Sequence, residues 1–484
     1  MNKRTISSLI KCFVLLILLL PTWLAWDVSP AQGATILVSR PDDPTPDTCL
    51  SGSDCSLREA IILANLTPTT LDQIYLPTNT YHIERSGNDD TSVLGDFDIT
   101  SPIEIYGIED TPSSVVRIEG DQLDRVFEVT GSNGDLWLER VTITEGYQPL
   151  YNGGGVACYH ATLTLEDVVL VLNSSPAHYG GGLAADHCTV TISNTNITNN
   201  TASDGGGIFV NVSTQSLINS IVYYNHATSV GGGIYSINSD IDFYAVTLGA
   251  NDAATRGGGV FQLGSDSSLL IDHSLVEGNH ANTLEGGGLQ ISEGTNLTIV
   301  NSTISGNVAD TFGGGISTSI PTTINHSTIV NNHADMNANN DGYGGGVFAY
   351  IGSVVTISNS ILANNIDHSA FHYNDCAEYV GVDVISNGYN LVESGGNCTF
   401  ISTGDLPGLD PMLGPLQNNG GWTNTHALLI GSPAIDAGDP SVTRILYPNS
   451  DQRGPARYAR VVNGRVDIGA FEAWLVTFLP VVFR

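Results

Sequence analysis

The amino-acid sequence predicts an all-β protein, a right-handed parallel β-helix built from coils of about 26 residues. A Gly-Gly-Gly triplet recurs eight times at nearly regular spacing, and an asparagine recurs once in every unit. Segments such as "LTIVNSTISGN" alternate apolar and polar residues and are rich in β-branched side chains, which is typical of short strands. A fixed period in this range indicates a stacked array of coils, each with two or three strands.

The first 34 residues are expected to be a secretory signal peptide. They contain the basic start MNKR, a short apolar run from Cys12 to Leu20, and small residues around Gly33 and Ala34, where cleavage is expected. The run is too short to span the roughly 30 Å hydrocarbon layer of a membrane. The sequence therefore predicts an exported protein that is secreted or held at the cell surface, with peripheral or no membrane association.

Six cysteines follow the predicted signal peptide, and an even number in an exported chain favours disulfides. Proximity in sequence predicts bonds between Cys49 and Cys55 and between Cys376 and Cys398. Cys158 and Cys188 remain, and they are about one repeat apart but three residues out of register, so their pairing stays open. A zinc site is disfavoured because no CxxC pair occurs.

The chain is strongly acidic, with a formal net charge of −33. All basic residues after Lys11 are arginines and the acidic residues far outnumber them, so nucleic acid, whose binding needs clustered positive charge, is not expected as a partner. Acidity of this kind serves either solubility or calcium binding. Neither an EF-hand loop nor a periodic GGxGxD array is found, so no cofactor is assigned and calcium is the one ion left open.

The glycine triplets are spaced 25 to 31 residues apart, and each is followed by an aliphatic residue that should point into the core. Tight turns between strands stacked about 4.8 Å apart leave no room for side chains and require positive φ, which explains the glycines. A phosphate-binding loop is disfavoured because GxxxxGK[ST] is absent. The triplets begin at Gly153, Gly180, Gly205, Gly231, Gly257, Gly286, Gly313 and Gly344.

One asparagine per unit is expected to form a ladder, in which each side-chain amide bonds its equivalents in the coils above and below. Asparagine also tolerates the left-handed conformation that a sharp bend needs. The predicted ladder consists of Asn173, Asn200, Asn225, Asn251, Asn279, Asn307, Asn332 and Asn365.

Several motifs resemble known bacterial families. "CSLREAI" at residues 55–61 resembles the signature of CSLREA-domain proteins, and the Gly-Gly-Gly-aliphatic units are similar to repeats of polymorphic outer membrane proteins, which are adhesive β-helices. "DPMLGPLQNNGGWTNTHALLIGSPAIDAGD" and "VDIGAFE" resemble a choice-of-anchor Q domain. The resemblance implies a secreted β-helix with a surface-attachment tail, although the end "WLVTFLPVVFR" contains no LPxTG motif.

The expected organisation has five parts. A signal peptide (1–34) is followed by an N-terminal CSLREA-like segment with the first coils (35–140) and the repeat array (141–375). A choice-of-anchor-Q-like region (376–472) and a short apolar tail (473–484) complete the chain.

No catalytic site is identified, although a polysaccharide lyase or glycoside hydrolase of the β-helix type remains the alternative. Lyases of this kind need a basic residue to abstract a proton. Arg256 is the only Arg or Lys between Val141 and Val442, and its place before a glycine triplet favours a turn residue.

Two columns could bind a ligand. The second position after each triplet should face outward, and Phe209, Tyr235 and Phe261 form its longest aromatic run, suited either to a sugar or to stabilising the stack. The residue after each ladder asparagine yields His226, Asp252 and His280 on consecutive coils, which could bind a divalent metal or be turn-surface polar residues. The sequence thus favours a structural or adhesive protein whose partners are cell-surface glycans or envelope components.

Overall fold

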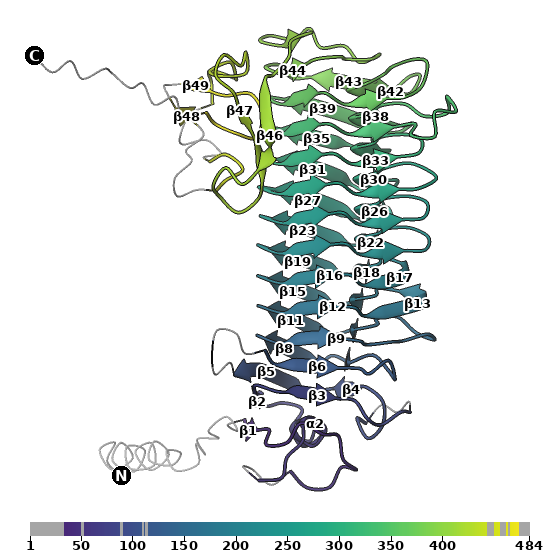
Figure 1. The fold of residues 1–484 in the computed structure, drawn as a ribbon, viewed down its shortest axis with the longest axis vertical. Coiled ribbons are helices and arrows are strands. Elements are labelled where there is room, and N and C mark those ends of the chain that lie inside the picture. Colours follow the sequence, from purple (N-terminus) through teal and green to yellow (C-terminus); the bar gives the residue numbers. More distant parts are fainter. Residues whose placement is uncertain are drawn as a thin grey trace, which may run out of the picture.

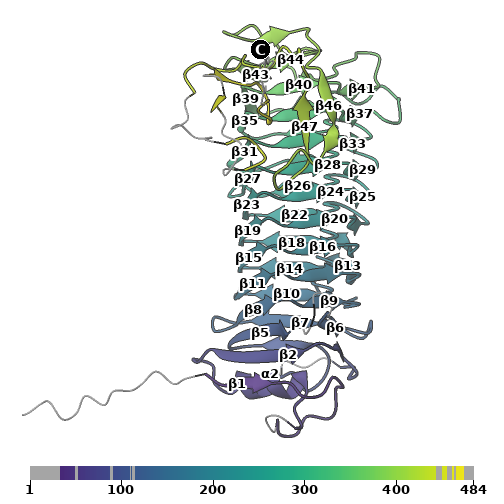
Figure 2. The same cartoon turned by 60° about the vertical axis from the view of Figure 1, so that its left-hand side comes forward.

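The computed structural model describes residues 33–49, 53–87, 91–108, 111, 115–442, 450–454, 461–462 and 465–473 of the chain. Nearly all of the predicted signal peptide and apolar tail lies outside these ranges. The described part is a column of stacked coils with a helix at its N-terminal end and a smaller C-terminal region against one flank (Figures 1 and 2). The predicted parallel β-helix is confirmed.

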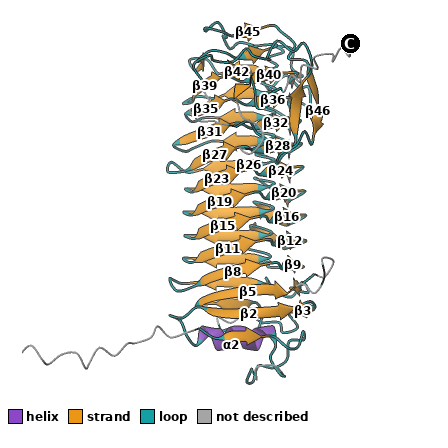
Figure 3. Ribbon diagram, turned by 90° about the vertical axis from the view of Figure 1, so that its left-hand side faces the viewer, coloured by secondary structure: helices purple, strands orange, loops and turns teal. Residues whose placement is uncertain are grey.

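Four parallel sheets run along the column, and each complete coil of the array contributes one short strand to every sheet. Along the chain a coil passes first through sheet 2, which follows the glycine triplets, then through sheets 1 and 3, and last through sheet 4, which follows the ladder asparagines. The orange strands of Figure 3 show the stacking of successive coils. Sheet 4 was not expected, because its strands in most coils are only two residues long and carry no alternation that a sequence pattern can reveal.

Sheet 1 has 13 strands, which are the longest strands in most coils. They are β1 (Thr35–Leu37), β2 (Asp72–Pro77), β5 (Pro102–Ile108), β8 (Asp135–Glu139), β11 (Thr162–Glu166), β15 (Thr189–Ser193), β19 (Thr214–Ile218), β23 (Asp240–Tyr244), β27 (Ser268–Asp272), β31 (Asn296–Val300), β35 (Thr322–Asn325), β39 (Val354–Ser358) and β43 (Asp383–Ser386).

Sheet 2 has 11 strands, and those of the repeat array directly follow the glycine triplets. They are β4 (Phe97–Ile99), β7 (Phe127–Thr130), β10 (Val156–Tyr159), β14 (Leu183–Asp186), β18 (Ile208–Asn211), β22 (Ile234–Ile237), β26 (Val260–Leu263), β30 (Leu289–Ile291), β34 (Ile316–Thr318), β38 (Val347–Ala349) and β42 (Cys376–Glu378).

Sheet 3 again has 13 strands, and those of the repeat array precede the ladder asparagines. They are β3 (Thr80–His82), β6 (Arg117–Glu119), β9 (Thr142–Thr144), β12 (Val169–Val171), β16 (Asn196–Thr198), β20 (Ile221–Tyr223), β24 (Thr247–Gly249), β28 (Leu275–Glu277), β32 (Thr303–Ser305), β36 (Thr328–Val330), β40 (Ile361–Ala363), β44 (Leu391–Val392) and β45 (Leu406–Pro407).

Sheet 4 has eight strands that follow the ladder asparagines. They are β13 (Ser174–Tyr179), β17 (Thr201–Asp204), β21 (His226–Ala227), β25 (Asp252–Ala253), β29 (His280–Ala281), β33 (Val308–Ala309), β37 (His333–Ala334) and β41 (Ile366–Asp367). Strands β42 to β45 extend the other sheets past residue 375, where the repeats end in the sequence, as far as Pro407.

The core is a continuous apolar column inside the coils. The aliphatic residue after each triplet has no exposed surface, as expected, and it stacks on its equivalents in register, for example Ile208 on Ile234 and Ile234 on Val260. Parallel sheets buried on their inner face in this way combine hydrophobic stacking with a continuous backbone ladder.

The asparagine ladder is confirmed. Asn251 donates from Nδ2 to Oδ1 of Asn279 at 2.9 Å and to the carbonyl of Val222 at 3.0 Å. Its own Oδ1 accepts from the backbone N–H and from Nδ2 of Asn225, both at 3.0 Å. The same bonds repeat from Asn173 to Asn365, where the carboxylate of Asp375 accepts the last amide.

The left-handed bend is displaced by one residue from the expected position. The residue before each ladder asparagine adopts positive φ, for example Tyr224 at 55° and Ala250 at 49°, whereas the ladder asparagines do not. The preceding residue makes the bend, and this leaves the asparagine side chain directed inward at the end of sheet 3, where it can reach the next coil. Gly278 and Gly306 occupy the same column.

The glycine triplets behave as predicted. The first glycine has positive φ in every coil, from 62° at Gly257 to 78° at Gly153. A Cβ on Gly233 would lie 2.7 Å from the carbonyl oxygen of Gly259 in the next coil, a distance that side chains cannot accept. Stacking at the spacing of a sheet therefore requires glycine here.

A single helix within the described residues, α2 (Leu57–Asn65), covers the N-terminal end of the column and belongs to the "CSLREA" motif. Ser56 caps the helix: its hydroxyl accepts from the backbone of Glu59, whose carboxylate accepts in turn from the backbone of Ser56 at 2.8 Å. No helix in the described ranges is both long and apolar enough to cross a membrane.

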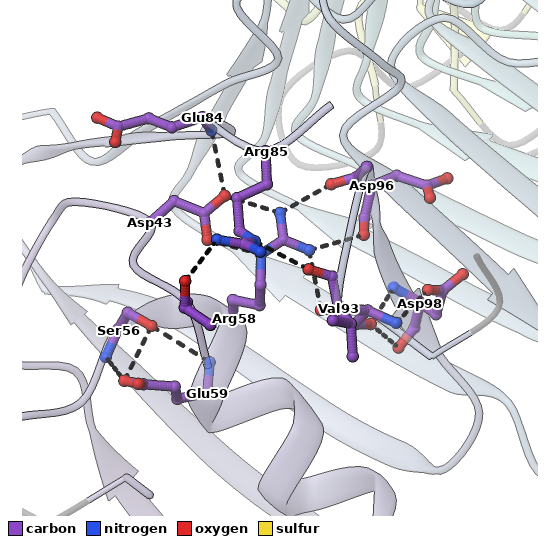
Figure 4. Close-up of polar contacts among 12 residues, drawn as sticks. Asp43, Ser56, Arg58, Glu59, Glu84, Arg85, Val93, Asp96 and Asp98 are labelled. Carbon is purple, nitrogen blue, oxygen red and sulfur yellow. Dashed lines mark hydrogen bonds and ion pairs between the residues drawn. The ribbon is translucent and has the colours of Figure 1, made fainter. Parts of the chain in front are cut away.

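Arg58 of the motif is the largest fully buried side chain. Its guanidinium forms a bidentate ion pair with Asp43, at 2.6 and 2.9 Å, and donates to the carbonyls of Gly95 and Asp96 (Figure 4). Phe97 lies against its other side, 4.8 Å from ring centre to guanidinium carbon. The motif therefore joins the helix to the first coils, a structural role.

The C-terminal region packs on the outer side of sheet 3. It contains the antiparallel pairs β46 (Leu413–Gln417) with β47 (Thr425–Leu428) and β48 (Val461–Val462) with β49 (Arg465–Val466). Buried polar bonds attach it to the coils: Gln452 accepts from Thr303 at 2.6 Å, and His426 bonds Ser305 at 3.0 Å.

All three disulfides are present. The pairing left open, Cys158 with Cys188, links consecutive coils with Cα atoms 6.3 Å apart. Cys188 precedes β15 rather than lying within sheet 2, which accounts for the three-residue offset.

We expect Asn251→Ala to lower the free energy of unfolding by about 1–3 kcal/mol, because buried donors and acceptors in two neighbouring coils lose their partners. Urea denaturation of the variant and the parent measures this loss. Asn196→Ala, which removes an exposed amide from β16, is the control and should change stability little. An unchanged midpoint for Asn251→Ala would show that the ladder contributes nothing to stability.

Replacement of Arg58 by methionine should cost about 3–5 kcal/mol, because it leaves the buried carboxylate of Asp43 without its cation. Arg117→Met, at a side chain that is 43% exposed in an ion pair with Glu119, should cost less than about 1 kcal/mol. Thermal unfolding of both variants compares them. Equal losses would contradict a structural role for the buried arginine.

Candidate ligand-binding groove

The predicted aromatic column lies on the outer side of sheet 2. Phe209, Tyr235 and Phe261 are in register on consecutive strands, with neighbouring ring centres 5.5 Å apart. Their neighbours in each strand, such as Ile208 and Val210, point into the core. The expected outward direction is therefore correct.

The column is nevertheless covered, which favours the stack-stabilising alternative over a sugar-binding surface. Phe209 and Phe261 are only 4% and 5% exposed. Tyr179 stacks over Phe209 at 4.6 Å, and the first glycine of each triplet lies against the column: a Cβ on Gly257 would be 2.7 Å from the Cβ of Phe261. Burial also raises the pKa of Tyr235 to about 12. The geometry is that of a stabilising aromatic ladder.

The same outer face opens in the next two coils, where the column changes to Gln290 and then Ser317. Smaller polar residues replace the rings there, and a groove of about 660 Å³ forms over β30, β34 and β38. We call it the sheet-2 groove. It is lined by Arg256, Leu284, Glu285, Gln290, Ser292, Thr311, Phe312, Ser317, Ser319, Asp341, Phe348 and Tyr350.

Two buried polar atoms in the sheet-2 groove have no partner within the described part of the chain. Gln290 is 3% exposed and donates from Nε2 to Ser292 at 3.0 Å, but its Oε1 accepts nothing. Thr311 is 6% exposed and its hydroxyl is equally unpaired. Because buried polar groups are nearly always hydrogen-bonded, these atoms indicate a site that water or a ligand completes.

Aromatic rings form one end of the groove. Phe312 stacks on Phe348 with ring centres 4.6 Å apart, and Tyr350, which is 41% exposed, lies 5.8 Å from Phe348. An apolar ring face beside unpaired hydrogen-bonding atoms suits a ligand that is itself amphipathic, such as a sugar ring.

The groove is close to neutral at its centre and acidic at its rim. Arg256 pairs with Glu285, Nε to Oε1 at 3.1 Å, and Asp341 is exposed. Arg256 precedes a glycine triplet, as expected of a turn residue, but it also lines the sheet-2 groove. With its charge balanced by Glu285, the groove has no spare cation to attract a polyanion.

The candidate metal trio is brought together on sheet 4. Asp252 Oδ2 is 2.8 Å from His226 Nδ1, and Asp252 Oδ1 is 3.7 Å from His280 Nδ1. Asp252 Oδ1 also accepts from Asn282 at 2.7 Å. All three side chains are more than a third exposed, and a metal role for them stays a prediction.

A second group with metal-ligand chemistry was missed by sequence reasoning. Potential ligand atoms of His82, Glu119 and Asp121 lie within 4.8 Å of one another. His82 and Glu119 are register partners on β3 and β6, in the N-terminal coils, where no glycine triplet marks the register. His82 Nδ1 already forms a hydrogen bond with Asp121 at 2.9 Å, and this bond accounts for the cluster.

A shallower groove of about 540 Å³ lies between sheet 3 and the C-terminal region. Tyr224 and Trp422, 61% and 44% exposed, are among its lining residues. Because these residues are about 200 positions apart, no sequence pattern could have joined them. Nothing buried and unpaired faces this groove among the lining residues, so it is the weaker candidate.

The comparison with protein-family models agrees with the fold. A family model described as a right handed beta helix region matches residues 206–403. Among curated proteins none matches the sequence. Among solved structures, the chain is similar to one described as "Crystal structure of pectate lyase Pel9A", at 17% identity and a TM-score of 0.46, over 91% of this chain and 97% of that one. The stacked parallel sheets and the family model together show that the chain is a right-handed parallel β-helix.

If the aromatic column is structural, Phe209→Ala should lower stability by about 3–5 kcal/mol, the usual cost of removing a buried ring. Tyr350→Ala on the same outer face should cost about 1 kcal/mol or less, because the ring is 41% exposed. Chemical denaturation followed by far-UV circular dichroism compares the two. If the Phe209→Ala variant is as stable as the parent, the column is not structural and is again a candidate for ligand binding.

Proposed function

We propose that the protein is secreted or displayed at the cell surface as a structural or adhesive β-helix, and that it binds neutral glycan segments in the sheet-2 groove. The observation that carries this proposal is the pair of buried, unpaired polar atoms of Gln290 and Thr311 beside the stacked rings of Phe312 and Phe348. Sugars combine hydroxyls with an apolar ring face and fit such a lining.

The net charge of the chain limits the class of ligand that it is expected to bind. A net charge of −33 disfavours acidic polysaccharides and nucleic acids, and it favours neutral glycans of a cell surface or envelope. Three disulfides support export, since such bonds persist in oxidising compartments. Association with membrane would then be peripheral or lacking.

A polysaccharide-cleaving activity is the second candidate. It is favoured by one feature, the convergence in the sheet-2 groove of Arg256, the only basic residue between positions 141 and 442 apart from histidines, with Glu285 and Asp341. Such a set could transfer protons if a substrate separated Arg256 from Glu285. Binding without product release distinguishes adhesion from cleavage.

Glycan-array binding with the parent, Gln290→Leu and Tyr350→Ala tests the proposal. Leucine preserves the volume of Gln290 and removes its unpaired atom, so affinity should fall at least tenfold through a lost hydrogen bond to the ligand. Tyr224→Ala, in the other groove, is the matched control and should bind as the parent does.

Glycan binding that survives both sheet-2 groove variants would contradict this site, and a loss confined to Tyr224→Ala would assign the ligand to the other groove. Reducing-end and unsaturated-product assays on the bound glycans, run in parallel, report cleavage. Product that disappears in Glu285→Gln would replace the adhesive role by the enzymatic one.

A further inference from the structure

The connection between β37 and β38 contains oxygen-bearing side chains at every second position. They are Asp335, Asn337, Asn339 and Asp341, and Gly342 follows. The repeat that contains this connection is the longest, with 31 residues from the start of its triplet to the start of the next. Its additional residues lie in this connection. Alternating Asp and Asn at positions 1, 3 and 5 is the pattern of calcium-binding loops, in which position 7 coordinates through its backbone carbonyl; here position 7 also carries a carboxylate.

The backbone of this loop turns where a calcium loop must turn. In EF-hand loops the sixth position is glycine because the chain bends sharply there. Asn340 occupies the sixth position from Asp335 and has a φ of 70°, in the left-handed region that asparagine tolerates. A search that requires glycine at this position therefore misses the loop, as the sequence analysis did.

The carboxylate of Asp335 faces the interior of the loop. Its Oδ2 accepts from the backbone N–H of Asn340 at 3.2 Å. Further along the loop, Asn339 Oδ1 accepts from the backbone N–H of Asp341 at 3.0 Å. Backbone N–H groups of the loop thus point toward the oxygen atoms of its own side chains.

A second, independent observation points to a ligand in this interior. Asp335 is completely buried, yet its Oδ1 has no hydrogen-bond partner in the described part of the structure. Burial raises the pKa of Asp335, and repulsion from Asp341 and Asp367 adds to that rise. A buried carboxylate with an unpaired oxygen and two acidic neighbours is costly unless a cation or a proton compensates it.

We propose that residues 335–341 bind one Ca²⁺ ion through the carboxylates of Asp335 and Asp341 and the side-chain carbonyls of Asn337 and Asn339. Four side-chain oxygens on a short irregular loop suit the flexible coordination of Ca²⁺ better than the strict octahedron of Mg²⁺. The Ca²⁺ site stands on its own, although Asp341 also lines the sheet-2 groove, so a bound ion would stabilise that rim.

Equilibrium dialysis of the full chain against Ca²⁺ in 0.15 M NaCl, with the bound metal counted by atomic emission, tests the Ca²⁺ site. A loop of modest ligand charge in an exported protein should bind with a Kd of about 10⁻⁴ to 10⁻³ M. At saturation, Asp335→Asn and Asp341→Asn should each bind one ion fewer per chain than the parent. A tenfold excess of Mg²⁺ should not displace that ion.

Asp266→Asn controls for diffuse binding to this acidic chain, because it removes the same charge from an exposed turn, and it should match the parent. Asp341 is exposed, so its variant stays informative even if Asp335→Asn disturbs folding, which circular dichroism monitors. Equal occupancy in the parent and both loop variants would overturn the proposal. So would the loss of the ion in Glu119→Gln alone, which would place it at the His82 cluster.

Discussion

The whole structure depends on one constraint, that each coil must repeat the backbone path of the previous coil at the spacing of a β-sheet. Where coils touch through backbone, as at the Gly-Gly-Gly turns, any side chain would collide with the next carbonyl. Where they touch through side chains, the same residue must recur. The Asn ladder is the strictest case, because each amide bonds the backbone and the side chain of its neighbour.

This constraint acts on the inside of the column and much less on the outside. The position after each triplet is aliphatic in every coil, whereas the next position varies from Ala157 to Phe209, Gln290 and Ser317. The aromatic residues Phe209 and Phe261 fill the space beneath the chain that returns to the triplet, whereas Gln290 and Ser317 leave part of it open. The sheet-2 groove is the consequence, and its buried unpaired atoms distinguish it from a simple packing fault.

The period, the inward column, the ladder and the glycine turns were predictable because each repeats eight times in the sequence. Sheet 4 was not, because two-residue strands such as His226–Ala227 are too short to show the apolar-polar alternation that identifies a strand. The burial of Phe209 and Phe261 could not be predicted from the repeat, because it depends on the covering segment and on Tyr179, which belong to neighbouring turns. The contacts of Arg58 and of the C-terminal region each occur only once, so no repeated pattern indicates them. Arg58 pairs with Asp43, which lies outside the repeat array, and the C-terminal region bonds Thr303, which is far away in the chain.

Native-state hydrogen exchange, followed by mass spectrometry, tests most directly whether the ladder holds the coils in register. Peptides that contain the ladder positions from Asn200 to Asn332 should exchange their protected amides only through global unfolding, whereas the segments that precede the triplets should open first. Exchange at the ladder that is as fast as in those outer segments would contradict register control by the Asn column.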